Sequence, residues 1–524
     1  MGTVLFGLDG GTFTVLDPLM RDGIMPNLRS FVGGAVRAEL LSTPNPVTPP
    51  AWTSMMTGRS PGHHGILDFV RAEERRGGMY FTITNSRDVR CETIWSIAGR
   101  QGRRITALNF YGMAPPRPVH GNTISGFVPG RHLARSSHPR DLFDRLAVLG
   151  ERFSPKVLGM DLDTEKKCIQ GLLPEEYEGW ITHHIERERA WFDVLRHLME
   201  TDPCPLTAIV FDGVDKLQHL CWRFLDPALL PARPSAWETK IRNLCERYFR
   251  QLDTFLGEVV GLAGDEGSIV IVSDHGFGAT TEVVYINAWL HRRGLLTWSD
   301  NAPLDAGAGL MVDRLKDHVS LLDWDRTRAY ALTPSSNGIF IRGVPPHEYT
   351  AFRGELIDAL KDLRDPATGQ PVITDVRTRE QAFPGSATLL APDLTLTLRD
   401  GGLVSILNSD TLVKPRPEPA GAHRPEGIFL AKGPGFRKGE TVGALSILNV
   451  APVLLHSVGL DTPSDMEAGV PAEIYAPEFL KARPARVGER TQPPEAFPEK
   501  SDASLDADSD AEMLARLREL GYIE

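Results

Sequence analysis

The sequence predicts an α/β protein built on a large, mostly parallel sheet that is flanked by helices. Short apolar runs recur along the chain, and three of them run into Asp within two residues: Thr3–Leu8, Pro205–Phe211 and Ser268–Val272. Between these runs lie segments with helical spacing of apolar residues, such as Glu186–Glu200 and Arg242–Leu262. Strands that alternate with helices are typical of a doubly wound sheet, which binds its ligands at the carboxyl ends of its strands.

Composition excludes several classes of protein. The chain has 524 residues, a net charge of −11, 49 glycines and 40 prolines, which suits a large enzyme with many loops rather than a partner of nucleic-acid polymers. No apolar run is long enough to span a membrane, and the N-terminus lacks the basic and apolar regions of a signal peptide. The five cysteines are scattered without a CxxC pair, so they predict neither a disulfide framework nor a thiolate zinc site. We therefore expect a cytoplasmic protein that does not bind membranes.

The chain is predicted to form one catalytic domain with two additions at its C-terminus. The domain spans 1–480, with cap-like insertions at about 120–180 and about 285–400. Residues 481–510 are rich in Pro and acidic residues and predict a flexible linker. Residues 511–524 predict an amphipathic helix, which could dock a partner or a second copy of the chain; its apolar stripe contains Met513, Leu514, Leu517 and Leu520.

The stretch TPPAWTSMMTGRSPGHHGI, residues 48–66, carries the candidate nucleophile. Thr48 is expected at the N-terminal edge of a helix, directly before Pro49 and Pro50. A hydroxyl there would lie beside free backbone N–H groups and the positive end of the helix dipole, a good place for a phosphate or an ionised nucleophile. The alternative is that Thr48 only caps an ordinary helix.

Carboxylates and imidazoles recur at spacings suited to metal ligation. Asp215 and His219 are four residues apart, so on a helix they share one face, although such a pair also occurs on ordinary surfaces. Asp274 and His275 follow a buried strand, where the chain turns and both side chains can converge.

Two further residues complete the predicted metal centre. Asp9 follows the first strand, where it could instead cap the next helix, and His423 stands in the loop GAHRPEG ahead of another strand. A mixed set of oxygen and nitrogen ligands suits zinc, with manganese as the alternative. The set is large enough for two metals about 4 Å apart, the arrangement that clamps an in-line phosphoryl transfer. Its members are Asp9, Asp215, His219, Asp274, His275 and His423.

The order of these motifs resembles the alkaline phosphatase superfamily, and within it the type I phosphodiesterase/nucleotide pyrophosphatase branch. The resemblance covers about residues 1 to 460 and rests on LDGG, the Thr48 stretch, DKLQH, SDHG and GAH, in that order. It implies a large mixed sheet flanked by helices, with insertions that shape the substrate pocket, and a nucleophilic role for Thr48. It also implies two zinc sites, one formed by Asp9, Thr48, Asp274 and His275, and the other by Asp215, His219 and His423.

One departure from the family pattern concerns substrate binding. Nucleotide-cleaving members carry an Asn after the HGI motif that touches the phosphate, whereas residues 67–70 here read LDFV. Asn109, near the end of the strand predicted at Arg104–Phe110, is the candidate replacement, with a structural role equally open.

The sequence therefore predicts a metal-dependent hydrolase of phosphodiesters, including nucleotide pyrophosphates, that acts on a small phosphorylated substrate. Thr48 would attack phosphorus, and water would hydrolyse the resulting phospho-threonine. The N–H groups after Thr48, together with the metals, would stabilise the phosphoryl oxygens. Three alternatives stay open: a phosphomonoesterase, a phosphotransferase or mutase on the same metal core, and a non-catalytic binding protein that retains the fold.

Overall fold

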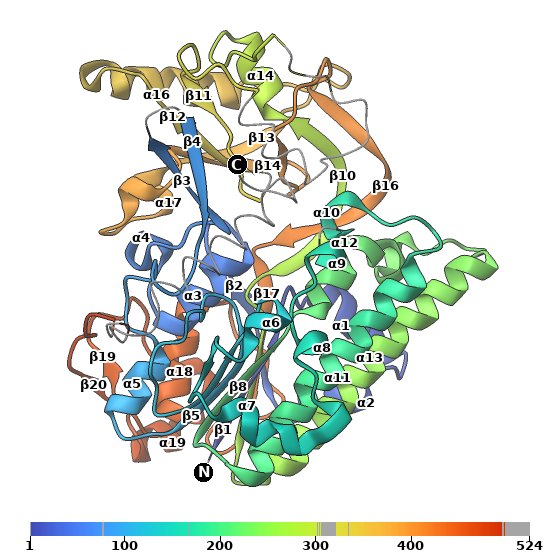
Figure 1. Cartoon of the computed structure of the whole chain (residues 1–524), viewed down its shortest axis with the longest axis vertical. Helices are drawn as coiled ribbons and strands as arrows, with labels where there is room; N and C mark the ends of the chain where they lie inside the picture. Colours follow the sequence, from blue (N-terminus) through green and yellow to red (C-terminus); the bar gives the residue numbers. More distant parts are fainter. Residues whose placement is uncertain are drawn as a thin grey trace.

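The computed structural model describes residues 2–494 and Phe497, except 76–77, 166, 301, 303, 305–320 and 334. Its centre is a sheet of nine strands (Figure 1). From one edge to the other the strands are β18 (Leu445–Ser446), β2 (Val36–Leu41), β17 (Glu426–Lys432), β9 (Ser268–Val272), β1 (Thr3–Leu8), β8 (Leu206–Phe211), β5 (Ile105–Phe110), β6 (Gly121–Ser125) and β7 (Ser137–His138). The run from β9 to β6 is parallel throughout, while β17 and β7 pair antiparallel with their neighbours. The predicted fold class is confirmed.

Helices cover both faces of this sheet, as the apolar character of its central strands requires. Along β1, Val4, Phe6 and Leu8 join the core on one face, whereas Leu5 joins the core on the other. The first face carries α1 (Phe13–Arg21), α2 (Pro26–Val32), α11 (Tyr177–Thr201), α12 (Gly213–Leu225) and α13 (Ala236–Ala263). The second carries α3 (Thr48–Thr57), α5 (Ile94–Arg100) and α18 (Val450–Ser457), and Figure 1 shows the two layers on opposite sides of the sheet.

The predicted insertion at about 285–400 forms a cap with its own apolar core above the carboxyl edge of the sheet (Figure 1). It contains α14 (Ile286–Arg292), α16 (Pro346–Lys361) and a four-stranded sheet in the order β11 (Ala329–Tyr330), β12 (Gly338–Ile341), β14 (Leu394–Leu398) and β13 (Ile373–Thr378). A long antiparallel ribbon of β10 (Gly276–Tyr285) and β16 (Val413–Arg424) joins the cap to the main sheet. A second ribbon, β3 (Val70–Arg75) with β4 (Gly78–Ile83), also reaches the cap.

The first predicted insertion, at about 120–180, differs from expectation. Its beginning does not form a cap, because β6 and β7 extend the main sheet beyond β5. The short helices of this segment leave the sheet, and those after β7, such as α8 (Pro155–Leu158) and α9 (Leu162–Glu165), pack beside α11 and α12. The sequence gives no strand signal here, because the five residues of β6, Gly121–Ser125, are mostly small and polar although most of them are buried.

The predicted linker from 481 to 510 begins later than expected. Strand β20 (Val487–Gly488) pairs with β19 (Thr462–Pro463), and Thr491 donates to the Asp465 carboxylate at 2.7 Å from its hydroxyl and 2.8 Å from its N–H. These contacts hold 487–491 against the domain. The predicted helix at 511–524 lies outside the described residues. In the part of the chain that the structure covers, no helix combines the length and the apolar character needed to cross a membrane.

Helix α2 depends on a carboxylate from a distant helix. Met25, at its N-cap position, provides no side-chain hydrogen bond. Instead Asp253, buried in α13, accepts bonds from the backbone N–H groups of Asn27 (3.0 Å) and Leu28 (2.7 Å) and from the Asn27 amide (3.0 Å). A negative group at this position satisfies N–H groups that would otherwise be orphaned and favours the helix dipole.

We expect Asp253→Ala to lower the free energy of unfolding by about 2–3 kcal/mol, because a charged acceptor of several buried N–H groups is lost. Urea denaturation followed by circular dichroism would measure this loss. Asp253→Asn keeps one carbonyl acceptor and should lose less. Equal losses for both variants would show that packing at this position, and not hydrogen bonding, stabilises α2.

Candidate functional site

The predicted ligands meet at the carboxyl edge of the sheet. Strands β9, β1 and β8 are parallel neighbours, with Leu8 opposite Phe211 and Gly7 opposite Val272, so their ends lie side by side. Each chain segment that leaves these ends carries part of the set: Asp9 follows β1, Asp274 and His275 follow β9, and Asp215 and His219 lie on α12, which starts just after β8. Thr12, and not Asp9, caps the helix that follows β1.

His423 reaches the same edge from the opposite direction. It lies on β16, which pairs antiparallel with β10 so that Phe277 is opposite His423. This pairing stacks the ring of His423 on that of His275, with 3.8 Å between the ring centroids. The ribbon that carries the cap therefore also brings the last predicted ligand into the cluster.

One group of ligands comprises Asp9, Asp274 and His275, all fully buried. The Nε2 atom of His275 lies 3.5 Å from Asp9 Oδ1 and 3.4 Å from Asp274 Oδ2. One ligand atom from each residue lies within 4.8 Å of the other two, a spacing that a single cation could bridge.

The second group comprises Asp215, His219 and His423. Asp215 Oδ1 lies 3.1 Å from His423 Nε2 and 3.5 Å from His219 Nε2, and the two Nε2 atoms are 3.0 Å apart. The groups adjoin each other, because Asp215 Oδ1 is also 4.0 Å from His275 Nε2. The six predicted ligands thus form one continuous cluster.

Several ligand atoms of this cluster are buried without a hydrogen-bond partner: Asp9 Oδ1, Asp215 Oδ1, Asp274 Oδ2 and His275 Nε2. In Asp9 and Asp274 the second carboxylate oxygen is held by the protein. Trp52 Nε1 lies 3.4 Å from Asp9 Oδ2, and the Gly10 N–H donates to Asp274 Oδ1 at 3.0 Å. Buried polar atoms are rarely left without a hydrogen-bond partner. The unpaired atoms of this cluster are therefore good candidates for cation ligands.

The histidines follow the same pattern. His423 Nδ1 is 2.9 Å from the Pro46 carbonyl and His275 Nδ1 is 3.2 Å from the Gly276 carbonyl, so we assign the proton to Nδ1 in each. Each Nε2 is then an unprotonated acceptor that faces the carboxylates. A carbonyl bonded to the distal nitrogen is the usual support of a metal-bound imidazole. The ligand types and their supports therefore fit divalent cations of the zinc or manganese class.

Electrostatics of the cluster lead to the same conclusion. Burial, followed by repulsion from Asp274, raises the pKa of Asp9 well above its usual value, and burial raises the pKa of Asp274 to about 8. Burial acts to raise the pKa of Asp215, but the facing His219 and His423 outweigh burial. The pKa of Asp215 therefore lies well below its usual value. Burial lowers the pKa of His275 and keeps its ring neutral. Without a cation, burial and mutual repulsion thus favour the protonated forms of Asp9 and Asp274.

Thr48 begins α3, whose N-terminus is tied to both ligand groups. Pro46, two residues earlier, accepts the bond from His423, and Trp52, one turn later, contacts Asp9. Trp52 comes this close because it packs on Gly7, where an added Cβ would lie 2.7 Å from its ring. Thr48 itself is buried.

The structure corrects one feature of the predicted helix start. Val47, and not Thr48, occupies the N-cap position, and Thr48 is the first helical residue. Pro49 and Pro50 have no N–H, and the Ala51 N–H donates to Val47. The expected row of free N–H groups after Thr48 therefore does not exist, and the first turn can offer only the N–H of Thr48 itself.

His64 is a supporting residue that sequence reasoning did not single out. It is fully buried, its Nδ1 accepts from the Ile66 N–H at 3.1 Å, and its Nε2 lies 2.9 Å from Ser54 Oγ on α3. Burial lowers the pKa of His64 to about 3, so the ring is neutral and donates to Ser54. This bond fixes the turn after α3, and the motif GHHGI was the sequence signal for it.

Asn109 occupies a different environment from the one expected of a substrate contact. It is fully buried, and its amide donates to the Val210 carbonyl (2.8 Å) and to Asp212 (3.1 Å). These bonds are typical of a structural residue, and a direct contact with substrate stays a prediction. Asp212 is the centre of a buried network that the sequence did not reveal, since it is also paired with Arg187 of α11 and with Lys216 at 2.7 Å.

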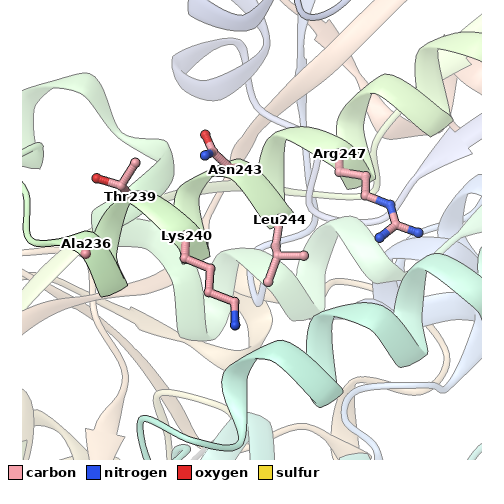
Figure 2. Close-up of a pocket in the computed structure, with 6 residues that line it drawn as sticks. All are labelled: Ala236, Thr239, Lys240, Asn243, Leu244 and Arg247. Carbon is pink, nitrogen blue, oxygen red and sulfur yellow. The ribbon is translucent and has the colours of Figure 1, made fainter.

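Figure 2 shows a shallow hollow along the outer surface of α13. Its lining contains none of the predicted ligands and neither Thr48 nor Asn109, so it does not belong to the site described above. The lining residues are Ala236, Thr239, Lys240, Asn243, Leu244 and Arg247.

Comparisons with known proteins agree with this geometry. The model of the family "type I phosphodiesterase / nucleotide pyrophosphatase" matches residues 3–425. Among solved structures, phosphonoacetate hydrolase from Sinorhizobium meliloti 1021, in complex with phosphonoformate, is 15% identical with a TM-score of 0.52, over 87% of this chain and 96% of that chain. Human ectonucleotide pyrophosphatase/phosphodiesterase 5 is 15% identical with a TM-score of 0.49, over 88% of this chain and 96% of that chain. The comparison with curated proteins yields no relative.

At 15% identity, the likeness to phosphonoacetate hydrolase supports the fold alone. The family match is different in kind, since it spans most of the chain and includes every predicted ligand and Thr48. The chain therefore belongs to the type I phosphodiesterase/nucleotide pyrophosphatase family of the alkaline phosphatase superfamily, whose members are divalent-metal-dependent hydrolases of phosphoric esters.

Proposed function

We propose that this protein hydrolyses phosphodiesters, including nucleotide pyrophosphates, through a phospho-threonine intermediate on Thr48 at a centre of two divalent cations. Zinc is the first candidate and manganese the second, because the ligands combine carboxylates with imidazoles. The observation that carries the proposal is the attachment of the Thr48 helix to both ligand groups, through Pro46 and Trp52.

The chain's own groups have distinct roles in this proposal. Asp9, Asp274 and His275, with Thr48, would hold one cation, and Asp215, His219 and His423 the other. Bound cations supply Lewis acidity, which lowers the pKa of a nearby hydroxyl and offsets charge on phosphoryl oxygens. The Thr48 oxygen forms a bond to phosphorus as the bond to the leaving alcohol breaks, and water then cleaves the phospho-threonine and restores the hydroxyl. Backbone assistance is limited to the Thr48 N–H, because two prolines follow.

Charge balance favours diesters over monoesters. The three carboxylates of the cluster and two divalent cations leave one net positive charge, which a singly charged diester would neutralise. A monoester carries up to two negative charges and would need a further cationic group. Two buried cations near the cluster, Lys216 on α12 and Arg187 on α11, are already paired with Asp212.

The expectations about substrate size, binding partners and cellular location remain predictions. We expect a small phosphorylated substrate, no nucleic-acid polymer or membrane partner, and a cytoplasmic location. Docking of a partner or of a second copy through residues 511–524 is likewise a prediction.

The substrate class can be tested with chromogenic esters in the presence of Zn²⁺ or Mn²⁺. We expect faster hydrolysis of bis(p-nitrophenyl) phosphate than of p-nitrophenyl phosphate, because of the charge balance above. The opposite ranking by a large factor would identify a phosphomonoesterase. Activity towards neither ester, unless an acceptor alcohol is added, would identify a phosphotransferase, and binding without any turnover would identify a non-catalytic protein.

The role of Thr48 can be tested by substitution. Thr48→Ala should abolish turnover while metal content and stability are nearly retained, and Thr48→Ser should keep much of the rate because it keeps the hydroxyl. The measurement is the single-turnover rate, with the metal stoichiometry of each variant as control. Activity of Thr48→Ala within about tenfold of wild type, or about 1.4 kcal/mol of barrier, would show that Thr48 is not the nucleophile.

Metal binding should depend on pH through Asp274. With its pKa at about 8 in the metal-free protein, this carboxyl must release a proton on binding, so metal affinity should fall as pH is lowered from 8. The folded pKa lies above the unfolded value of 3.8, so this group's contribution to the stability of the metal-free protein is present below that value and is lost as pH rises to 8.

Calorimetric titration with Zn²⁺ at pH 6–8, in buffers of different ionisation enthalpy, measures the proton release. The melting temperature of the metal-free protein gives the stability trend, with metal-free Asp274→Asn as the matched control that cannot titrate here. If wild type and Asp274→Asn show the same pH trend, Asp274 is already ionised before metal binds.

A further inference from the structure

The base of the ribbon formed by β10 and β16 has two different faces. In the ladder, Phe277 is opposite His423, and Gly276 is opposite Arg424. Because side chains alternate along a strand, Phe277 and His423 share one face, with their ring centroids 5.0 Å apart, and this face belongs to the ligand cluster. Arg424 lies on the other face. The residue that directly follows the last predicted ligand therefore points away from the cluster.

Two glycines make room for the Arg424 side chain. An added Cβ at Gly278 of β10 would lie 2.8 Å from Arg424 Nε, and one at Gly401 would lie 2.6 Å from its Cζ. Gly401 also has a φ of 68°, which favours glycine in its own right. It belongs to the turn at 399–402, which follows β14 in the cap. The guanidinium thus contacts both the ribbon and this cap turn.

Four backbone carbonyls accept hydrogen bonds from the Arg424 guanidinium. Nη1 donates to Gly401 and, at 3.1 Å, to His423, while Nη2 donates to Ala279 and Asp400. Two of these carbonyls belong to the two strands of the ribbon, and the other two belong to the cap turn. The planar guanidinium has five N–H donors in a fixed fork, which suits such an arrangement, whereas a Lys ammonium is a single point with three donors.

A second attachment holds the cap turn to the ribbon farther from the cluster. The Asp400 carboxylate accepts from the Thr280 hydroxyl at 2.7 Å and from the N–H groups of Thr281 and Glu282 at 3.0 and 3.3 Å. The cap turn is therefore fixed to β10 without Arg424. What only Arg424 adds, among these contacts, is the bond to the His423 carbonyl, so we expect its loss to be felt mainly at His423.

We propose that Arg424 is a positioning residue for the cation group of Asp215, His219 and His423, because it fixes the backbone from which the His423 imidazole projects. This inference rests on the cation centre of the proposed function and adds a residue outside its ligand set. The ring of His423 has its own support, since its Nδ1 lies 2.9 Å from the Pro46 carbonyl. Partners that orient a ligand commonly contribute about 10–100-fold to metal affinity.

The charge of Arg424 would have the opposite effect on cation binding. A positive group in the residue next to a cation ligand repels the cation. If charge alone mattered, removal of the guanidinium would strengthen metal binding. Weaker binding after its removal would therefore report the loss of positioning.

The test is a competition titration of the metal-free protein with Zn²⁺ against a chromogenic chelator. Wild type should bind two cations, and Arg424→Met should weaken one of the two sites by about 10–100-fold. Arg424→Lys keeps the charge but not the four bonds and should also weaken that site; it serves alone if Arg424→Met does not fold. Arg399→Met is the matched control and should leave both affinities unchanged, since Arg399 of the same turn binds the Glu282 and Asp365 carboxylates instead.

A double-mutant cycle with His423→Ala tests whether Arg424 acts through His423. Arg424→Met should weaken zinc binding much less in the His423→Ala background than in the wild-type background. Unchanged or tighter zinc binding by both Arg424 variants, or an equal loss in both backgrounds, would overturn the inference. Ester hydrolysis is measured separately: two bound cations in wild type without turnover of any ester would refute the proposed function, whereas the zinc titration still decides the role of Arg424.

Discussion

The burial of three carboxylates at one edge of the sheet is the constraint on which the rest of the structure depends. Asp9 and Asp274 are completely removed from water, and Asp215 is close enough to share the same imidazoles. Like charges this close cannot all ionise unless positive charge is supplied. The buried cations on the neighbouring helices are engaged by Asp212, so in the described part of the chain they do not offset the cluster. Divalent cations resolve this conflict.

Hydrogen bonds around the cluster orient the predicted cation ligands. Four of the six predicted ligands offer one atom to the cluster and have the other held by a protein partner: Trp52 for Asp9, the Gly10 N–H for Asp274, and backbone carbonyls for His275 and His423. Such supports set the direction of each free lone pair before a cation arrives. Two of the same supports, Trp52 and Pro46, also lie in or next to the helix that Thr48 begins, so the proposed nucleophile and the predicted ligands belong to one hydrogen-bonded assembly.

The cap shares residues with this assembly. The ribbon of β10 and β16 contains His423 at its base and continues directly from His275, then rises into the cap. Asp68, two residues before β3, binds the cap through Thr333 and Ser335. The predicted ligands and Thr48 thus belong to the sheet edge, whereas the cap is a separate unit with its own apolar core, joined to that edge by the ribbon. Such a division would let one metal core serve different substrates within a family, because function resides in sites built on a shared fold.

The sequence by itself determined the central strands, the Asp residues at their ends, the shared helix face of Asp215 and His219, and the order of motifs that identifies the family. These features depend on local periodicity and on motif spacing, which a single chain displays directly. The sequence also shows that Pro49 and Pro50 lack N–H groups. Together with the hydrogen bond from the Ala51 N–H to the Val47 carbonyl, this leaves only the N–H of Thr48 available in the first turn of α3.

Tertiary structure decided the rest. The pairing of β16 with β10 brought His423 to His219, 204 residues earlier in the chain, and the approach of α11 to β8 placed Arg187 on Asp212 and enclosed Asn109. The small polar strand β6 became part of the sheet because its neighbour β5 offered a free edge, and this placed Phe127 beside Tyr111. Contacts of this kind depend on how distant segments pack, and no local pattern in the sequence encodes them.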